Sequence, residues 1–408
     1  MNFNVLYSWV KDLPIVDWHN HLDLSALAED KPLGSLYEVW VKADPYKHRA
    51  MRICGEPEHV ITGDASEGVK WAAWTRTLPK LVGNPLFAWA RQELAFLRGT
   101  GSSASEKWWK SVENVSLAEW TPSKMLKKFG VEYLSPCVGV GELEGLLTSD
   151  ARLQNAREAG SNSKSEVLSP KSSPRIAPSL RMNVDDAIGL ATLEKLKSAG
   201  CRVVDISVDD VAKLSTHNSQ LLNVAAYAAA HGWTMLLHLG ALRETSSRLR
   251  AAAGPAGGFA GMRASVDPAA IAAFLNALEK MNALPRTILM TLNPEAHASL
   301  AVLAGSFNGA GLPGKVQLGP AWWWCDHEEG IRDVLEKNAA YGVLSTFVGM
   351  TTDSRSLLSF VRHDYFRRIL CKWVAEKVAS GAFPDDESLL RPMLENICYK
   401  NAHDMVFS

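Results

Sequence analysis

Short runs of β-branched and apolar residues recur along the chain, and most precede a polar or glycine-containing turn and then a helical pattern of apolar positions. This alternation is typical of a parallel sheet whose strands are joined by helices. Eight such runs fit strands, which favours a (β/α)8 barrel over an open sheet. The predicted strands cover residues 13–19, 131–138, 175–181, 201–208, 234–240, 286–293, 315–321 and 343–351.

The stretch between the first and second predicted strands is far longer than an ordinary crossover connection. It is rich in tryptophan and contains amphipathic segments that predict helices. We expect residues 34–125 to form a helical insertion over one end of the barrel. The whole chain, residues 1–408, is then expected to form a single barrel domain.

The charge balance and the cysteines narrow the cellular setting. The 43 basic residues nearly match the 44 acidic ones, so no surplus charge favours nucleic acid or an anionic membrane as a partner. No apolar run approaches ~18 residues, so neither a transmembrane segment nor a signal peptide is expected. The six cysteines are spread singly, which favours reduced thiols over a disulfide framework. We therefore predict a cytoplasmic protein.

Two histidines at the end of the first predicted strand are the first candidates for chemistry. His19 and His21 are two residues apart, so their side chains project from one face of a strand and can bind one metal ion. Asp353 follows the eighth predicted strand, which lies beside the first in a closed barrel. Two imidazoles and a carboxylate suit a divalent ion such as zinc or manganese. Alternatively, Asp353 only caps the following helix, and the two roles are compatible.

Further polar residues lie near the ends of predicted strands, at the same mouth of the barrel. A lone histidine in an apolar run is ordinarily a core residue, but the position of His238 at this mouth favours a functional role, and Asp205 is interpreted in the same way. Arg181, Arg243 and Arg355 surround the mouth, and a guanidinium can bind a carboxylate through two hydrogen bonds. We predict an anionic small-molecule substrate, with surface ion pairing as the alternative for any single arginine.

Three consecutive tryptophans, Trp322, Trp323 and Trp324, follow the seventh predicted strand. Three adjacent indoles cannot all be core residues, so at least one is expected to face a cavity or the inserted helices. Stacking on a sugar, packing against a lid and plain packing are the three possible roles.

Nine stretches of the sequence carry a family resemblance when they are taken in order. They are DWHNHL (17–22), DPYKHRAMR (44–52), TGDAS (62–66), GNPLFAW (83–89), LHLGALR (237–243), PRTILMTLNP (285–294), GKVQLGPAWWW (314–324), FVGMTTDSRSLLSFVRHDYFRRILC (347–371) and NICYKNA (396–402). Together they run along nearly the whole chain, which resembles the uronate isomerase (glucuronate isomerase) family of the amidohydrolase superfamily.

The resemblance implies a distorted (β/α)8 barrel of the amidohydrolase type. The implied reaction converts D-glucuronate into D-fructuronate, or D-galacturonate into D-tagaturonate, in hexuronate catabolism. This aldose–ketose shift passes through an enediol or enediolate, so it needs an acid–base group and an electrophile that stabilises the developing oxyanion. The implied partner is a small sugar acid, and a homo-oligomer is expected.

The resemblance also assigns expected roles by position. The metal residues are His19, His21 and Asp353, with Zn2+ expected and Mn2+ as the alternative. The expected catalytic residues are Tyr46, Asp353, Arg355 and His238. The expected substrate-binding residues are Arg181, Asp205, Arg355, Trp322 and Trp323. Tyr46 and Asp353 are the candidates for proton handling, and which of them moves the C2 proton stays open.

The sequence departs from the family pattern near the predicted mouth. Pro45 stands where members usually carry a histidine before the tyrosine, Met182 and Asn183 replace a Pro-Asp pair, and Ile206 stands where histidine is usual. The metal residues are retained. Two alternatives therefore stay open. One is a metal-dependent hydrolase of a sugar lactone or related ester, in which the ion lowers the pKa of bound water toward ~7. The other is a catalytically impaired homologue that only binds a sugar acid.

Overall fold

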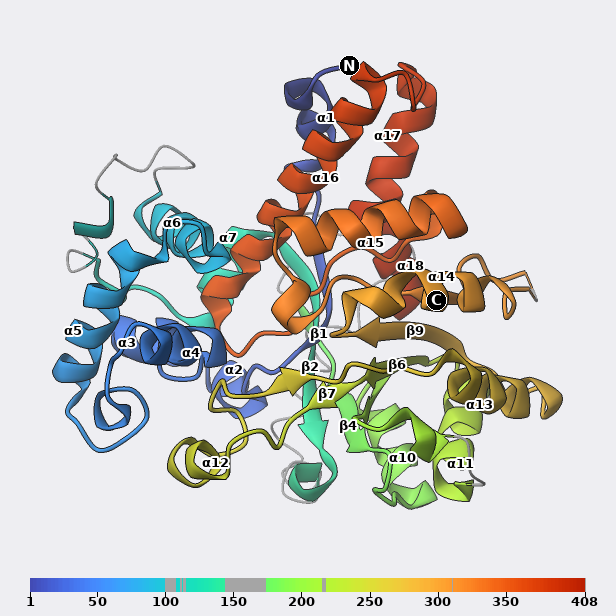
Figure 1. The fold of residues 1–408 in the computed structure, drawn as a ribbon, viewed down its shortest axis with the longest axis horizontal. Helices are drawn as coiled ribbons and strands as arrows, with labels where there is room; N and C mark the ends of the chain where they lie inside the picture. Colours follow the sequence, from blue (N-terminus) through green and yellow to red (C-terminus); the bar gives the residue numbers. More distant parts are fainter. Residues whose placement is uncertain are drawn as a thin grey trace.

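A curled parallel sheet forms the centre of the molecule (Figure 1). The structure, a computed structural model, describes residues 1–99, 108–110, 112, 115–143, 174–214, 218–309 and 311–407. Neighbouring strands follow the order β1-β2-β4-β5-β6-β9-β10, and the short β3 also pairs with β2. The strands are β1 (Ile15–Asn20), β2 (Val131–Gly139), β3 (Arg175–Ile176), β4 (Ser179–Asn183), β5 (Val203–Val208), β6 (Thr234–Leu239), β9 (Arg286–Thr291) and β10 (Val316–Leu318).

Seven of the eight predicted runs contain strands of this sheet. The third run is split into β3 and β4 around Pro178, whose nitrogen cannot donate to a ladder. The structure adds a short antiparallel pair that was not predicted, β7 (Ala241–Leu242) with β8 (Gly261–Met262).

The eighth predicted strand, residues 343–351, is wrong, because this run forms a 3₁₀ turn (Leu344–Thr346) and then an extended segment outside any ladder. Gly349 interrupts the segment with a φ of +74°, and a Cβ there would lie 2.0 Å from the carbonyl oxygen of Ile397. A β-branched or apolar pattern cannot reveal such a turn, since a left-handed residue breaks the strand whatever its neighbours prefer.

Side-chain hydrogen bonds hold this segment in the place of an eighth strand. On one side, Gln317 of β10 accepts from the Val348 backbone N–H at 2.8 Å. On the other side, the buried Asp17 of β1 accepts from the Thr351 hydroxyl at 2.8 Å and from the Thr352 backbone N–H at 2.7 Å. The backbone N–H of Asp353 then donates to the carbonyl of His19 at 3.1 Å. The barrel is thus closed between β10 and β1 by side-chain hydrogen bonds and isolated backbone hydrogen bonds rather than by a regular ladder.

Helices cover the outside of the sheet. Their starts follow ordinary capping chemistry: Asp267 accepts from the Ala269 backbone N–H ahead of a helix that begins at Pro268. The covering helices are α10 (Leu190–Ser198), α11 (Ser219–Ala230), α13 (Pro268–Lys280), α14 (His297–Gly305), α15 (Glu328–Tyr341) and α16 (Val361–Ala379). Further helices are α1 (Phe3–Val10), α12 (Ser247–Ala253), α17 (Glu387–Glu395) and α18 (Asn401–Phe407), with a π-helical turn (Asn396–Lys400) before α18. Among the described residues, no helix is both long enough and apolar enough to cross a membrane.

A second group of helices lies between β1 and β2 in the sequence. They are α2 (Leu24–Glu29), α3 (Leu36–Trp40), α4 (Pro45–Ile53), α5 (Glu67–Thr77), α6 (Pro85–Arg98) and α7 (Pro122–Phe129). In Figure 1, α3 to α6 gather on one side of the sheet, away from α10, α11 and α13. Buried tryptophans including Trp40, Trp74 and Trp89 form much of their shared core. This packing places the start of α4 beside the ends of the strands.

Candidate active site

A cavity of about 360 Å3 opens at the carboxyl ends of the strands. All ten residues to which the resemblance gives a metal, catalytic or substrate-binding role line it, which are His19, His21, Tyr46, Arg181, Asp205, His238, Trp322, Trp323, Asp353 and Arg355; Trp324 of the tryptophan run does not. A larger cavity of about 590 Å3 lies among α1, α6 and α16 and contains none of these residues. The smaller cavity is therefore the candidate site, because it brings together the histidines, carboxylates and arginines that could bind a metal ion and an anionic substrate.

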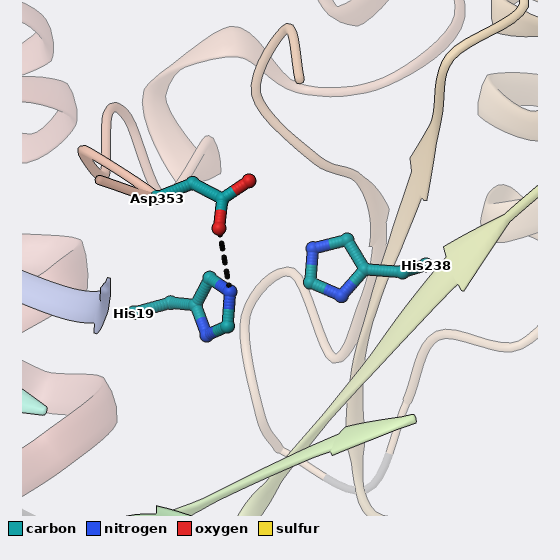
Figure 2. A group of neighbouring side chains, drawn as sticks. All are labelled: His19, His238 and Asp353. Atoms are coloured by element: carbon teal, nitrogen blue, oxygen red, sulfur yellow. Dashed lines mark ion pairs between the residues drawn. The ribbon is translucent and has the colours of Figure 1, made fainter. Parts of the chain in front are cut away.

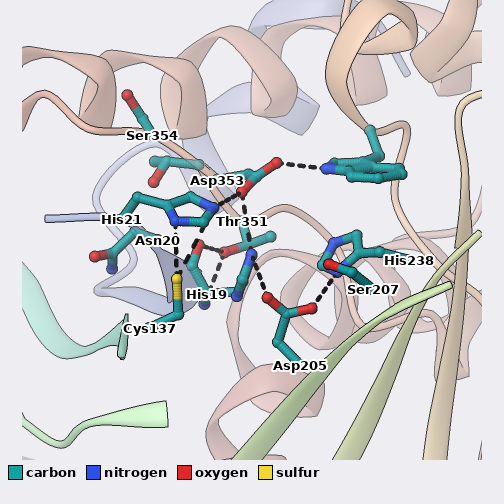
Figure 3. Close-up of polar contacts among 12 residues, drawn as sticks. His19, Asn20, His21, Cys137, Asp205, Ser207, His238, Thr351, Asp353 and Ser354 are labelled. Atoms are coloured by element: carbon teal, nitrogen blue, oxygen red, sulfur yellow. Dashed lines mark hydrogen bonds and ion pairs between the residues drawn. The ribbon is translucent and has the colours of Figure 1, made fainter. Parts of the chain in front are cut away.

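Two imidazoles and a carboxylate converge at the centre of this cavity (Figures 2 and 3). Oδ1 of Asp353 lies 3.0 Å from Nε2 of His19 and 2.9 Å from Nε2 of His21. His19 comes from β1, His21 lies just beyond its end, and Asp353 belongs to the segment that replaces the eighth strand. Asp353 has a φ of +46°, a left-handed conformation that aspartate tolerates better than most residues. The fold thus holds a strained residue where its carboxylate meets both histidines.

The donor set fits a divalent ion. His19 is fully buried, its Nδ1 has no hydrogen-bond partner among the described residues, and its Nε2 faces the carboxylates of Asp353 and Asp205 at 3.0 Å and 3.9 Å. Nε2 of the buried His238 is likewise without a partner, and ligand atoms of His19, His238 and Asp353 lie within 4.8 Å of one another (Figure 2). Buried polar atoms rarely stay unpaired in folded proteins. Nitrogen and carboxylate donors in this number suit a divalent transition-metal ion.

The protonation states agree with this fit. Burial alone would raise the pKa of Asp353, but the close imidazoles of His19 and His21 outweigh it and hold that pKa well below its usual range. Burial lowers the pKa of His21 to about 4. Burial also opposes a charge on His19, but the carboxylates of Asp205 and Asp353 raise its pKa. At neutral pH the site therefore combines an ionised Asp353 carboxylate with a neutral His21, the forms in which both groups bind a metal ion.

Neighbouring side chains orient the converging groups (Figure 3). Asp205 accepts a hydrogen bond from Nδ1 of His238 at 2.5 Å, which turns Nε2 of His238 toward the cavity. Sγ of Cys137 lies 2.9 Å from Nδ1 of His21. The indole N–H of Trp322 donates to Oδ2 of Asp353, and the Trp322 ring lies 4.2 Å from the His238 ring. Such outer contacts fix ring orientation and tautomer at metal centres.

Three arginines give the cavity its positive side. Arg181 and Arg355 line it, and neither guanidinium makes a hydrogen bond or ion pair with another described residue. Arg243 also lines the cavity, but it pairs with Asp209 at 3.0 Å and lies 5.7 Å from the Trp323 ring. Two guanidinium groups that have no partner among the described residues, and that lie beside the His/Asp group, can bind the carboxylate of a small anion.

The inserted helix α4 brings Tyr46 to the same cavity. The Tyr46 hydroxyl donates to Oδ2 of Asp326 at 2.9 Å, and the same oxygen accepts from Nη1 of Arg362 at 3.0 Å. The Arg362 guanidinium lies 4.0 Å from the Trp89 ring centroid. Burial raises the pKa of Asp326 to about 6, against the opposing effects of Arg362 and Tyr46. Burial and the Asp326 carboxylate also keep the pKa of Tyr46 well above its ordinary value.

Sequence reasoning did not single out Asp326, Arg362 or Cys137. Position carried some signal for each: Asp326 follows the tryptophan run, Arg362 lies within the matched stretch 347–371, and Cys137 lies near the end of β2. Residue type carried no such signal, because a buried arginine or a lone cysteine is usually a packing feature.

The departures from the family pattern fall in different places. Met182 and Ile206 are buried in the apolar core, since neighbours along a strand alternate and Arg181 and Asp205 take the cavity side. Asn183 is exposed and donates from its side chain to Asp186 at 3.0 Å. Pro45 lines the cavity as the first residue of α4. Of these four positions, only Pro45 changes the chemistry of the cavity wall.

Comparisons with known proteins agree with the sequence resemblance. A model of the glucuronate isomerase family matches residues 1–138 and 189–406. A uronate isomerase of Caldicellulosiruptor bescii is 32% identical over 452 aligned positions, covering 98% of this chain and 96% of the relative. A uronate isomerase of Geobacillus thermodenitrificans is 33% identical, with coverages of 98% and 95%. The first alignment spans more positions than the 408 residues of this chain, which therefore lacks some positions present in that relative.

Solved structures share the fold. The uronate isomerase of Thermotoga maritima superposes with a TM-score of 0.82 at 26% identity, covering 99% of this chain and 97% of the other. The glucuronate isomerase of Caulobacter crescentus gives a TM-score of 0.80 at 19% identity, with coverages of 99% and 93%. These neighbours confirm the predicted distorted (β/α)8 barrel.

Proposed function

Because this chain belongs to the glucuronate isomerase family, we propose that it interconverts the aldose and ketose forms of a hexuronate in hexuronate catabolism. The candidate pairs are D-glucuronate with D-fructuronate and D-galacturonate with D-tagaturonate. The observation that carries this proposal is the placement of Arg181 and Arg355, whose guanidinium groups have no partner in the described part of the chain, beside a convergent His/Asp group in one cavity of about 360 Å3. A hexuronate can place its carboxylate against the arginines and its adjacent oxygen atoms against the His/Asp group.

The metal is part of this proposal. His19, His21 and Asp353 would hold a divalent ion, Zn2+ in the first instance and Mn2+ as the alternative, and Nε2 of His238, which has no hydrogen-bond partner in the described part of the chain, lies close to the same donors. When bound, such an ion polarises a substrate oxygen and stabilises negative charge on it. Asp205 contributes by fixing the ring of His238 through the 2.5 Å hydrogen bond.

The remaining residues bind and orient the sugar acid. Arg181 and Arg355 receive the substrate carboxylate through paired hydrogen bonds, which fixes the end of the sugar opposite to the reacting carbons. Trp322 and Trp323 form an apolar wall for the carbon chain. Tyr46 supplies an acid–base hydroxyl from the other side of the cavity, and Asp353 is the second candidate for the C2 proton.

The decisive experiment is conversion of defined hexuronates by the purified protein. Metal-free protein is loaded with Zn2+ or Mn2+ and incubated with D-glucuronate and D-galacturonate, and products are followed by NMR. We expect conversion of at least one of them, and Arg355→Met is expected to raise KM by about 10-fold or more, as for loss of a charge-assisted hydrogen bond. Arg332→Met is the matched control, because Arg332 pairs with Glu376 on the outer helices. Absence of conversion with either metal refutes the proposal.

Lactone hydrolysis is the second candidate function, and the observation that favours it is Pro45. A proline at the cavity wall removes an imidazole that isomerases of this family usually carry, while the His/Asp group is retained. Release of acid from sugar lactones, with Asp353→Asn as a variant expected to lose it, tests this alternative. Calorimetric binding of hexuronates without any turnover would instead favour a binding protein.

We also propose the domain organisation and assembly predicted from the sequence. Residues 1–408 form one domain in which residues 34–125 are a helical insertion, and the location of Tyr46 on α4 at the cavity supports this. The chain is proposed to assemble as a homo-oligomer in the cytoplasm. Light scattering on the purified protein tests the assembly, and a monomer would refute it.

A further inference from the structure

Behind the cavity, one buried carboxylate joins the inserted helix α4 to the barrel. Asp326 follows the tryptophan run after β10, and its Oδ2 accepts from both the Tyr46 hydroxyl and the Arg362 guanidinium. Asp326 is 7% exposed and Arg362 is 3% exposed, so this contact is shielded from water. The Tyr46 ring is held in place by Trp89 and Trp324, whose ring centroids lie 5.7 Å and 5.1 Å away at steep angles.

The arrangement is directional. Tyr46 and Arg362 line the cavity, whereas Asp326 does not. Of these two cavity-lining groups that contact Asp326, the Tyr46 hydroxyl is the one that can pass a proton from a substrate, because a guanidinium stays protonated in proteins. The Tyr46 hydroxyl donates its hydrogen bond to Asp326, so the phenol proton already lies between the Tyr46 oxygen and the Asp326 carboxylate.

We propose that Asp326 is a positioning residue that takes the phenol proton of Tyr46 while Tyr46 takes a proton from the substrate. The inference rests on the proposed isomerase function. In the aldose-to-ketose direction, the C2–H bond breaks and its proton moves to the Tyr46 oxygen, as the Tyr46 O–H proton moves to Oδ2 of Asp326. The negative charge that Asp326 loses appears on the enediolate.

The second half of the reaction reverses these transfers and balances the charge. Tyr46 delivers a proton to C1 and regains its own proton from Asp326. The proton of the C2 hydroxyl moves to the adjacent C1 oxygen within the enediolate, so the C1 carbonyl becomes a hydroxyl, the C2 hydroxyl becomes a carbonyl, and no net proton or electron is consumed. Because the two proton transfers occur together, no free phenolate needs to form at Tyr46. This agrees with the raised pKa of that phenol.

Burial raises the pKa of Asp326, and the charges around it modify the pH at which this carboxylate is ionised and ready to accept a proton. Arg362 from α16, Tyr46 from α4, Asp353 from the closing segment and His327 from the same turn all act on it. With a pKa of about 6 for Asp326, kcat/KM should rise as the pH increases through about 6, because the ionised form accepts the proton. A hydrogen-bonding role alone requires no such rise.

Asp326→Asn tests the inference with several readouts, because asparagine keeps an oxygen acceptor for Tyr46 but cannot take its proton. We expect kcat to fall by about 10²- to 10³-fold, in the range of a lost general base, with KM within about threefold of the wild type. Exchange of the substrate C2 hydrogen with solvent deuterium, followed by NMR, should fall by the same factor. The rise of kcat/KM near pH 6 should disappear. If Asp326→Asn does not fold, Asp326→Glu keeps an ionisable carboxylate beside Arg362 and should keep a rise of kcat/KM with pH, and a folded, active Asp326→Glu without that rise would contradict the inference.

A double-mutant cycle shows whether Asp326 acts through Tyr46. In the Tyr46→Phe background, Asp326→Asn should lower kcat by less than about twofold, whereas independent effects would multiply. Asp333→Asn is the matched control, because Asp333 pairs with His297 and Lys337 on the outer helices. Suppose that the wild type is active. If the kcat of Asp326→Asn is then within threefold of the wild type, or if the effects of Asp326→Asn and Tyr46→Phe on kcat multiply, the role of Asp326 is overturned and the proposed function is not. A wild type that neither converts nor exchanges any hexuronate overturns the proposed function, and the role of Asp326 with it.

Discussion

The indole N–H of Trp322 should contribute directly to metal affinity. It donates to Oδ2 of Asp353, the oxygen that does not face the two histidines. In Trp322→Phe the ring stays apolar and aromatic, but Oδ2 loses the only hydrogen bond that it receives from the described residues. A hydrogen bond to a charged group contributes about 1.5–3 kcal/mol. Loss of an outer-shell partner typically weakens metal binding by about 10- to 100-fold, which corresponds to a similar energy.

We therefore expect Trp322→Phe to bind Zn2+ about 10- to 100-fold more weakly than the wild type. The dissociation constant is measured by competition with a chromophoric chelator at pH 7, starting from metal-free protein. Trp324→Phe is the matched control, since it removes the same volume but its indole nitrogen has no hydrogen-bond partner among the described residues. The reasoning is refuted if Trp322→Phe binds within threefold of the wild type, or if Trp324→Phe loses as much affinity.

Three further predictions concern the charge at the metal group, a buried ion cluster and acid stability. Asp353→Asn removes the charged oxygen on which both imidazoles converge, so the purified protein should lose its metal in elemental analysis and about 100-fold or more of kcat; full metal content would contradict this. Lys47→Met strips the cation from Asp44 (2.7 Å) and Glu93 (3.8 Å), and should lower the free energy of unfolding by about 3–5 kcal/mol in denaturant titrations; a loss below about 1 kcal/mol would contradict it. Burial lowers the pKa of His48 to about 4, so as the pH falls from about 6.5 to 4 the unfolded chain binds a proton that the native chain does not. Unfolding free energy should fall by about 1.4 kcal/mol per pH unit from this group, and His48→Phe should remove that part of the slope.

The parts of the site that the sequence predicted are those fixed by strand periodicity. Alternation along a strand brings Arg181 and Asp205 to the cavity and turns Met182 and Ile206 into the core. Position at a strand end was enough to place His238. The two-residue spacing of His19 and His21 also predicted convergence, although His21 lies beyond the end of β1.

The parts that the sequence could not predict depend on contacts between distant segments. Asp326 and Arg362 are 36 residues apart, and they meet Tyr46 only after α4 packs on the barrel. The failed eighth strand has a similar cause, because the left-handed Gly349 fits against the distant Ile397 backbone. Local sequence preferences do not reveal a close contact between two distant backbone segments. The apolar pattern therefore predicted a strand that continues through Gly349.

The side-chain closure between β10 and β1 couples the completion of the barrel to the assembly of its chemistry. Asp17 holds Thr351 and Thr352, and the next residue is Asp353, whose backbone N–H is bonded to the carbonyl of His19. A molecule in which this closure is open has therefore separated the Asp353 carboxylate from His19 as well. Asp17 does not line the cavity, but its substitution should thus lower activity as an active-site mutation does. A metal ion bound by both His19 and Asp353 should in turn stabilise the closed barrel.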